Sequence, residues 1–483
     1  MATPIPWTIR EILDATGGEA LSAGCPAPFP GICIDSRKIQ PREVFVAIEG
    51  PRFDGHDFID AVVESRAGCL VLRRDKATRF SHLDLKAMGI CCIAVDDTVN
   101  ALGDLASYRR RQADIPVVAI TGSTGKTTTR EMTVSICRRQ FETLSTSGNF
   151  NNEIGLPLTL FNLATDHRLA VVELGMNHPG EIHRLSAICS PDIGVITNIG
   201  PAHLEGLRDV ASVAKAKGEL LENIRPGGTA VINADDAYAR KLTAMAKTDV
   251  VLFGSGADAS IRSENIERQE EAVSFVLVMP GKRVDVTLTV SGSFMVQNAL
   301  AAAAAAHLLQ IHPETIKAGL ESFRPVEGRM MIYRTDNGAY IIDDTYNANP
   351  MSMAAAINAL ADFSGKGKGV LVAGDMLELG EQAAYYHEQI GKIAAGAGLS
   401  RMYLTGAHAG QMAHGAKAAG MSGKGILIGS KADIVKDLAS VLEPGDWVLV
   451  KGSRSTGMEE IVDRMAGDAR VRRPVFQPEA QEE

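Results

Sequence analysis

At 483 residues the chain is too long for one ordinary hydrophobic core, so we expect about three domains of ~150 residues each. Its composition, 45% hydrophobic and 22% charged, is that of a globular protein and excludes a disordered chain. The net charge of -9 argues against bulk nucleic-acid binding, which needs a basic face. A few well-placed Lys and Arg residues can still hold an anionic small substrate.

The seven cysteines are odd in number and form no C-x-x-C pair, which argues against a disulfide framework and favours a reducing cytoplasm. We expect most of them to be small buried hydrophobes. No basic region precedes an apolar run at the N-terminus, so we expect no signal peptide. Thr8 and Glu11 instead have the spacing of a capping box that opens a helix. The most apolar stretch, residues 299–309, is shorter than the ~20 residues of a membrane span.

Residues 1–113 mix short apolar runs, such as 44–48 and 69–72, with polar loops, and we expect a small α/β domain there. From 114 to 327, buried strands alternate with helices. The strand candidates are 116–120, 170–172, 193–196 and 229–232. This alternation predicts parallel βαβ units. A half-exposed strand at 284–290 and an alanine-rich core helix at 296–309 follow.

A third alternating series occupies residues 328–483. Its strand candidates are 340–342, 370–373, 402–404, 426–428 and 447–450. This series predicts a second doubly wound, Rossmann-like sheet. The predicted fold is therefore α/β with three domains, the central one a parallel-sheet domain that contains a phosphate-binding loop.

That loop lies between a strand and a helix. Its residues are Gly122, Ser123, Thr124, Gly125, Lys126, Thr127 and Thr128. Glycines let backbone N–H groups turn toward phosphate oxygens, and the helix N-terminus adds positive partial charge. Lys126 can reach the β- and γ-phosphates, and the Thr127 hydroxyl can ligate Mg²⁺. Ile120 replaces the first glycine of the longer motif, so this is the short G-x-x-G-K-T form of a nucleoside-triphosphate site.

Three further residues follow strands or lie near the loop in sequence. Glu173 and His203 come after two of the predicted parallel strands, whose carboxyl ends meet at one edge. Taken alone, Glu173 has the alternative of a solvated carboxylate and His203 that of a hydrogen-bonded loop histidine. For His203 the loop interpretation is the favoured one at this point. Lys217 lies on a helix, where spacing does not exclude a surface position.

Polar clusters also end three strands of the third domain. They lie at residues 343–350, 374–376 and 451–454. Two adjacent acids and two amides are costly to leave unpaired. Because all three clusters share the carboxyl edge of one sheet, they predict one wall of a cleft. A fourth cluster, residues 233–236 of the central domain, is equally consistent with a plain polar turn and with a contact to a ribose or to the water shell of a metal.

Together these motifs resemble the Mur ligase family, the ATP-dependent ligases that build the stem peptide of peptidoglycan. The resemblance spans nearly the whole chain. It is carried by residues 121–128, 147–155, 173–181, 233–236, 35–37 and 54–56. The runs 343–350, 374–380 and 451–454 are similar to those of family members that add a dipeptide, and no D-N-P-R motif of the third-residue ligases is present.

The resemblance implies an activity and its substrates. The carboxylate of UDP-N-acetylmuramoyl-tripeptide would attack the γ-phosphate of ATP, and D-alanyl-D-alanine would attack the resulting acyl phosphate. It implies ATP contacts at Asn298, Arg329 and Asp344 in addition to the loop. It implies substrate contacts at Ser36, Arg37, Asp54, His56, Asn151, Asn347, Asn349, Lys451 and Arg454. The implied setting is a cytoplasmic monomer in peptidoglycan precursor synthesis, with no nucleic acid and no membrane span.

The resemblance also implies two Mg²⁺ sites, with Thr127 as a ligand of the first, Glu173 and His203 as ligands of the second, and Lys126 as the catalytic cation. Lys217 matches the lysine that the family carbamylates, and Lys215 is the alternative two residues earlier. One pattern differs from the family, because Gly-Ser-Phe-Met at 292–295 stands where G-x-H-N is usual.

Three other hypotheses remain at this point. A sister ligase of the same fold would add a different amino-acid unit. A nucleotide-binding regulator would bind ATP without ligating. A nucleic-acid motor is disfavoured by the net charge and by the missing basic stripe.

Overall fold

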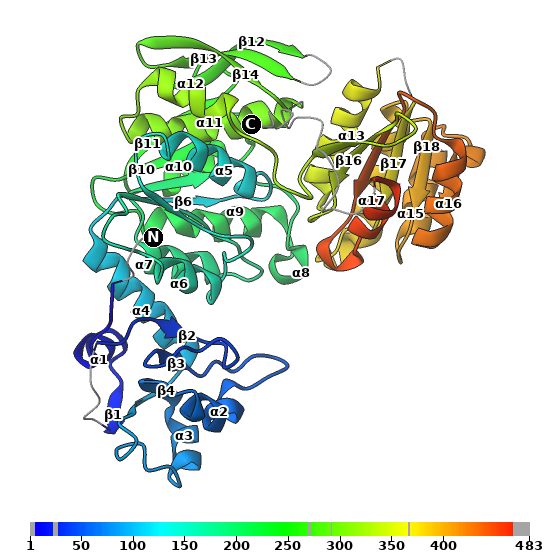
Figure 1. The fold of residues 1–483 in the computed structure, drawn as a ribbon. Helices are drawn as coiled ribbons and strands as arrows, with labels where there is room; N and C mark the ends of the chain where they lie inside the picture. Colours follow the sequence, from blue (N-terminus) through cyan, green and yellow to red (C-terminus); the bar gives the residue numbers. More distant parts are fainter. Residues whose placement is uncertain (1–4, 23–27, 269–271, 291, 366–367, 467–483) are drawn as a thin grey trace, which may run out of the picture.

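The computed structural model describes residues 5–22, 28–268, 272–290, 292–365 and 368–466. Three sheets follow one another along the chain, each packed against helices, which confirms the three-domain α/β prediction. In Figure 1 the N-terminal sheet lies at the bottom, the central sheet above it, and the C-terminal sheet to the right. No helix within these described ranges is long and apolar enough to cross a bilayer.

The N-terminal sheet has the order β1-β5-β4-β3-β2, with β1 antiparallel and the others parallel. Its strands are β1 (Glu19–Ser22), β2 (Ile32–Cys33), β3 (Val44–Val46), β4 (Cys69–Arg73) and β5 (Cys91–Val95). Its helices are α1 (Ile9–Thr16), η1 (Gly55–Phe58), α2 (Ile59–Glu64), α3 (Arg74–Ala77), η2 (Thr78–Phe80) and α4 (Thr98–Ala113). The strands predicted at 44–48 and 69–72 are β3 and β4, and the Thr8–Glu11 capping box opens α1 as predicted.

Helix α4 joins this domain to the next one. It packs against α1 on one side and against α6 (Gly155–Leu160) and α7 (Glu181–Cys189) on the other. The buried Arg110 of α4 donates to the carbonyl of Cys189 at 2.9 Å and to the Asp192 carboxylate at 3.1 Å. A buried guanidinium needs such partners, so α4 anchors the first domain to the second.

The central sheet has nine strands in the order β14-β13-β12-β11-β10-β9-β6-β8-β7. Its strands are β6 (Val117–Thr121), β7 (Thr143–Ser145), β8 (Leu169–Glu173), β9 (Ile193–Ile196), β10 (Thr229–Asn233), β11 (Asp249–Gly254), β12 (Ile261–Arg268), β13 (Val273–Met279) and β14 (Lys282–Leu288). Its other helices are α5 (Lys126–Cys137), α8 (Leu204–Leu207), α9 (Val210–Gly218), η3 (Glu219–Glu222), α10 (Ala239–Met245), α11 (Ser293–Leu308) and α12 (Pro313–Glu321). The four predicted strands are the parallel core β6, β8, β9 and β10.

Beyond this core the sheet changes direction. β12, β13 and β14 pair antiparallel and form an extension that the alternating βαβ pattern did not predict. The strand predicted at 284–290 is β14, whose side chains alternate between exposed and buried. The alanine-rich helix is α11, and its residues 301–306 are fully buried, so it is the core helix predicted.

The C-terminal sheet has the order β15-β16-β20-β17-β18-β19. Its strands are β15 (Met331–Arg334), β16 (Tyr340–Asp344), β17 (Gly369–Ala373), β18 (Arg401–Leu404), β19 (Ile426–Ile428) and β20 (Trp447–Lys451). Its helices are α13 (Pro350–Ser364), η4 (Gly380–Gln382), α14 (Ala383–Gly396), α15 (Ala409–Ala418), η5 (Gly423–Gly425), α16 (Lys431–Val441), η6 (Arg454–Thr456) and α17 (Glu459–Ala466). All five predicted strands are present and parallel, and the unpredicted β15 adds an antiparallel edge.

Most of the described cysteines are buried free thiols, as expected. Cys33, Cys69, Cys92, Cys137 and Cys189 are free thiols, and all but Cys33 are fully buried or nearly so. Cys91 is disulfide-bonded. One bonded cysteine in β5 is not a disulfide framework, and buried small hydrophobes account for most of the other described cysteines, as expected.

Two glycines set the closest helix packing in the C-terminal domain. A Cβ atom on Gly391 of α14 would lie 1.9 Å from the carbonyl oxygen of Met412, and one on Gly415 of α15 would lie 2.0 Å from that of Glu388. Backbone atoms cannot move aside as a flexible side chain can. The two helices therefore depend on glycine at both positions.

Replacing Gly391 with alanine should destabilise this domain, because α15 must move away to admit the methyl group. We expect a loss of ~1–3 kcal/mol in unfolding free energy, measured by denaturant titration. Gly396→Ala in the same helix is the matched control, since a Cβ there meets no atom within 4 Å. Equal unfolding midpoints for the two variants would contradict the packing argument.

Candidate active site

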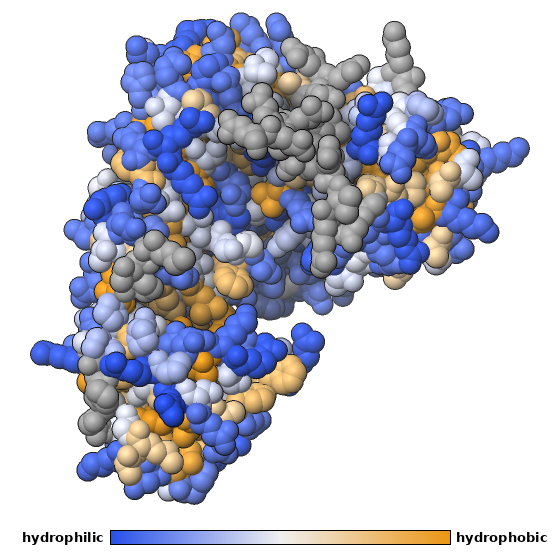
Figure 2. Space-filling model, viewed as in Figure 1, coloured by the Kyte–Doolittle hydropathy of each residue, from blue (hydrophilic) through white to orange (hydrophobic). Residues whose placement is uncertain are grey.

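A cavity of about 760 Å³ lies between the central and C-terminal domains. The central domain contributes the loop after β6 and residues that follow β8 and β9, and the C-terminal domain contributes loops after β16, β17 and β20. Both sheets thus present the carboxyl ends of their parallel strands to one space, the usual ligand position in such folds. Figure 2 shows an open notch between the N-terminal and C-terminal lobes below the central domain.

The loop from Gly122 to Thr128 is held by contacts that only glycine permits. Gly122 and Gly125 have φ angles of 153° and 77°. A Cβ on Gly122 would lie 1.8 Å from the Thr197 hydroxyl, and one on Gly125 would lie 2.2 Å from the Asn298 amide oxygen. Helix α5 begins at Lys126, so its free N–H groups and positive end face the cavity.

Lys126 is folded back on this loop and donates to the carbonyl of Gly122 at 2.8 Å. Burial lowers the pKa of Lys126, while the Glu173 carboxylate opposes that shift. Lys126 therefore lies beside the loop that its motif marks as a phosphate cradle.

Glu173, at the end of β8, lies at the centre of a buried polar cluster. Its carboxylate accepts hydrogen bonds from the Thr127 hydroxyl at 2.8 Å, the Asn151 amide at 2.8 Å and the Arg130 guanidinium at 3.2 Å. Only 3% of Glu173 is exposed, so the solvated-carboxylate hypothesis is wrong. Two of its partners, Thr127 and Asn151, are residues singled out from the sequence.

Lys217 and Lys215 differ sharply in their surroundings. Lys217 is fully buried and its Nζ has no hydrogen-bond partner, whereas Lys215 is exposed. Burial lowers the pKa of Lys217 well below its ordinary value, and the nearby Lys126 ammonium lowers it further. The surface-lysine hypothesis is therefore wrong for Lys217 and describes Lys215.

His203 precedes α8 in a left-handed conformation, with φ of 55°. Its Nδ1 lies 2.7 Å from the carboxylate of Glu378, which belongs to the C-terminal domain. Burial lowers the pKa of His203, and the Glu378 carboxylate opposes that shift. This pair joins the two walls of the cavity.

On the opposite wall, Lys451 is almost fully buried and pairs with residues of the loop after β16. Its Nζ lies 2.5 Å from the Asp344 carboxylate and 2.8 Å from the Asn347 carbonyl. Asn349 caps α13 and also donates its amide to the carbonyl of Ser123 at 3.1 Å, across the domain interface. These contacts hold the loop after β16 against the phosphate-binding loop.

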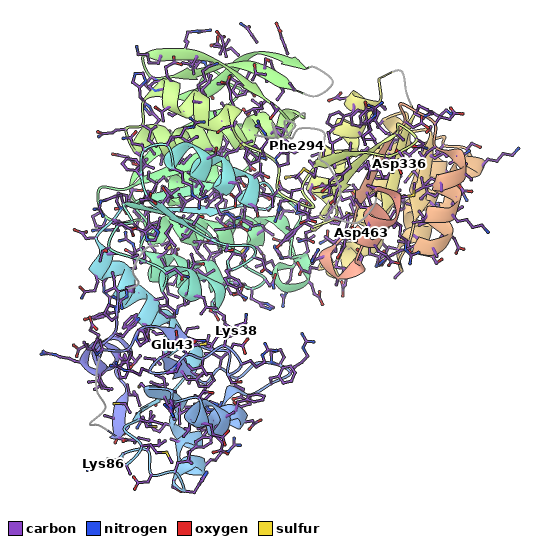
Figure 3. All side chains as sticks on the ribbon, viewed as in Figure 1. Lys38, Glu43, Lys86, Phe294, Asp336 and Asp463 are labelled. Carbon is purple, nitrogen blue, oxygen red and sulfur yellow. The ribbon has the colours of Figure 1, made fainter. Side chains whose placement is uncertain are left out.

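Arg329 and Arg454 lie on the same aromatic side chain. Their guanidinium carbons are 4.0 and 5.8 Å from the ring centre of Tyr346. Asn298 of α11 reaches the cavity beside Gly125, and its amide oxygen accepts from Thr129 at 3.4 Å. Phe294, part of the Gly-Ser-Phe-Met departure, lies where the central and C-terminal domains meet (Figure 3).

The residues expected to bind the uridine nucleotide lie outside this cavity, in the N-terminal domain. Arg37 pairs with Asp35 through two hydrogen bonds of 2.8 Å, which lower the pKa of Asp35 to about 2. Asp54 accepts from the buried His56 ring at 2.6 Å and from Lys76 at 2.5 Å. In this structure Arg37, Asp54 and His56 thus make local contacts that stabilise turns of the N-terminal domain.

Most of the sequence-predicted residues therefore meet in one cavity. Those that do not line it are Gly122, Lys217, Ser36, Arg37, Asp54 and His56. Residues 233–236 form a polar turn in which the Asp236 carboxylate accepts from the backbone N–H of Ile199 at 2.6 Å. Sequence reasoning did not single out Asn198, whose amide brackets Thr124 with bonds of 2.9 and 2.9 Å, or Glu378. Glu378 lies within the run 374–380, and Asn198 lies in the loop that leads from β9 to His203.

Three family models match consecutive parts of the chain. They are described as "Mur ligase family, catalytic domain" for residues 28–110, "Mur ligase middle domain" for 120–306, and "Mur ligase, glutamate ligase domain" for 328–454. Together they cover well over half of the sequence and coincide in order with the three sheets.

Relatives of known name and structure agree with these matches. The UDP-N-acetylmuramoyl-tripeptide–D-alanyl-D-alanine ligase of Escherichia coli (strain K12) is 36% identical over 459 residues, covering 94% of this chain and 97% of its own. A crystal structure of MurF from Acinetobacter baumannii superposes with a TM-score of 0.86 at 33% identity, covering 95% and 98%. MurF ligase from Thermotoga maritima in complex with ADP gives 0.80 at 29%, covering 90% and 96%. With these motifs, this cavity and these relatives, the chain belongs to the Mur ligase family.

Proposed function

We propose that this protein joins D-alanyl-D-alanine to UDP-N-acetylmuramoyl-tripeptide with hydrolysis of ATP to ADP and phosphate. One observation carries the proposal. A phosphate-binding loop with its lysine and a loop rich in acids and amides, from two different domains, line a single cavity. The named relative that covers almost the whole chain catalyses the ligation that such a cavity would support.

The first step brings together two anions, the tripeptide carboxylate and the γ-phosphate of ATP. A carboxylate oxygen bonds to the γ-phosphorus, the bond to the β–γ bridging oxygen breaks, and ADP leaves. Lys126 and the N-terminus of α5 offset the negative charge that gathers there. Arg329, on the opposite wall, adds a second cation.

In the second step, the amine of D-alanyl-D-alanine attacks the acyl carbon. The C–N bond forms, the C–O bond to phosphate breaks, and phosphate and the amine proton leave. The acyl phosphate would hydrolyse in water, so the cavity must close around it. The contacts from Asn349 to Ser123 and from Glu378 to His203 hold the two walls together and support this requirement.

The residues around Glu173 suit Mg²⁺, which prefers oxygen ligands and retains water and phosphate oxygens. The Thr127 hydroxyl and the Glu173 carboxylate lie 2.8 Å apart and could bind one ion together. His203 would serve a second ion. Within the described ranges no three His, Cys, Asp or Glu side chains cluster, so the substrates would complete each shell. When bound, the ions would neutralise phosphate charge.

Lys217 is proposed as the carbamylated lysine. An uncharged amine attacks CO₂, and burial favours the uncharged form of Lys217. The product, a carbamate, is an anion. Formed on the unpartnered Nζ of Lys217, it would stabilise the nearby Lys126 ammonium. The exposed Lys215 has none of these features.

We assign the remaining parts by the same proposal. Residues 1–113 would bind the uridine nucleotide, 114–327 would bind ATP, and 328–483 would bind the dipeptide and close on ATP. In Figure 3, Lys38, two residues beyond Ser36, lies on the side of the N-terminal domain nearest the central domain. The protein would work as a cytoplasmic monomer.

The acceptor requirement tests the activity. Phosphate release with ATP and UDP-N-acetylmuramoyl-tripeptide should depend on D-alanyl-D-alanine, because only the dipeptide amine completes the second step. A coupled phosphate assay with each acceptor in turn measures this. Equal turnover with single amino acids would support a sister ligase, and ATP binding without any turnover would support a regulator.

Lys126→Ala should lower kcat by ~10²–10³-fold, because a cation aimed at the transferring phosphate is lost from a site with little water. Steady-state kinetics measure the loss, and the thermal melting curve should match that of the wild type. Normal turnover in this variant would remove the phosphate-binding loop from the mechanism.

Lys217→Ala should be inactive and should recover part of its activity in added formate or acetate, which can replace a lost anionic group. Lys215→Ala is the matched control and should behave as the wild type, because that side chain is exposed. A fully active Lys217→Ala enzyme would exclude the carbamate.

A further inference from the structure

Glu378 combines a strained backbone with a carboxylate that crosses a domain boundary. Its φ is 62°, in the left-handed region that a non-glycine residue rarely adopts. Leu379 and Gly380 follow it, and a glycine at 378 would form the same turn without strain. Unfavourable backbone conformations that persist at a cleft commonly serve the site.

The turn around Glu378 is fixed from the central domain. The backbone N–H of Glu205 in α8 donates to the carbonyl of Glu378 at 3.0 Å. Gln382 donates from the same segment to the carbonyl of Arg208 at 3.0 Å. Gly380 lies so close to α8 that a Cβ there would be 3.3 Å from the Glu205 Cα. The turn around Glu378 and helix α8 can make these contacts only when the C-terminal and central domains are together.

These contacts direct the Glu378 side chain toward His203. Its carboxylate lies 2.7 Å from Nδ1 of His203, and both residues line the cavity. His203 is itself left-handed at the N-terminus of α8, so both ends of the contact are strained. The contact is a close charge contact and not an in-line hydrogen bond, because among the described residues His203 Nδ1 has no hydrogen-bond partner. The second ring nitrogen, Nε2, remains for a ligand in the cavity.

We propose that Glu378 is a positioning residue for His203, and that it orients the imidazole only when the C-terminal domain has closed on the central domain. A carboxylate 2.7 Å from Nδ1 favours a proton on that nitrogen and restricts the orientation of the ring through its charge, which is the part that outer partners play for histidines that bind metals. Domain closure would therefore both exclude water and set the orientation of the His203 ring in the central domain. The inference rests on the proposed function for the role of His203 in catalysis.

The first test does not require activity. In protein labelled with ¹⁵N-histidine, the ring signals of His203 are assigned as those lost in His203→Ala. In Glu378→Gly they should shift toward an unconstrained tautomer mixture, because the carboxylate is gone and the turn remains allowed. Glu381→Ala, an exposed charge removed from the same segment, should leave them unchanged. Unchanged His203 signals in Glu378→Gly would overturn the inference.

The second test separates positioning from folding. Glu378→Gly should lower kcat by ~10–100-fold, while its melting temperature stays close to that of the wild type, because relief of backbone strain offsets the lost contact and the larger entropy of the unfolded chain. In the His203→Ala background, the same change should alter kcat by less than about twofold. A clear fall in melting temperature, or an equal loss of kcat in both backgrounds, would overturn the inference.

The two tests also distinguish this inference from the proposed function. If the wild type releases no phosphate with the tripeptide and the dipeptide, the proposed function fails, and the histidine signals still decide whether Glu378 orients His203. If the wild type is active and Glu378→Gly matches it in kcat, the positioning role alone fails.

Discussion

Mutual repulsion between a carboxylate and a triphosphate is the constraint on which the rest of the structure depends. Both anions must reach one cavity, so positive charge has to be present there before they arrive. The short loop provides it with the N-terminus of α5 and Lys126, and glycines at 122 and 125 bring the backbone against Thr197 and Asn298 more closely than any side chain would allow. Burial of Lys126 makes each charge interaction stronger but also disfavours its own ammonium form, and the Glu173 carboxylate offsets that cost.

A cavity with charge on only one wall would remain open to water, which would compete for an acyl phosphate. The second wall comes from another sheet, whose loops are themselves fixed by a buried ion pair between Lys451 and Asp344. Breaking such a pair would leave an uncompensated buried charge, so the loop after β16 has one stable arrangement. Asn349 extends from that loop to the phosphate-binding loop. Rigid parts on each side, joined by a few polar contacts, are what a domain closure of this kind requires.

Much of this arrangement could be predicted from the sequence. Buried strands are short β-branched runs bounded by turn residues, and their carboxyl ends locate the chemistry, which is why Lys126, Glu173 and Asp344 were identified correctly as residues of one cleft. Strand β14 was predicted from its alternation of polar and apolar residues, whereas β12 and β13 and their antiparallel pairing were missed, because a βαβ series indicates parallel pairing only. The burial of Lys217 could not be predicted either. Lys215 and Lys217 lie on the same short helix, and the sequence does not show which of the two side chains points into the protein.

Contacts between domains were the least predictable feature. His203 and Glu378 are 175 positions apart, and neither local pattern indicates the other. Each had an ordinary interpretation alone, a loop histidine and an acid within a glycine-bounded run. Their left-handed backbones supply the missing information, because two unfavourable conformations that meet at 2.7 Å are stable only if the surrounding packing fixes both. Strain of this kind depends on tertiary structure, so it identifies a functional contact where residue type and spacing cannot.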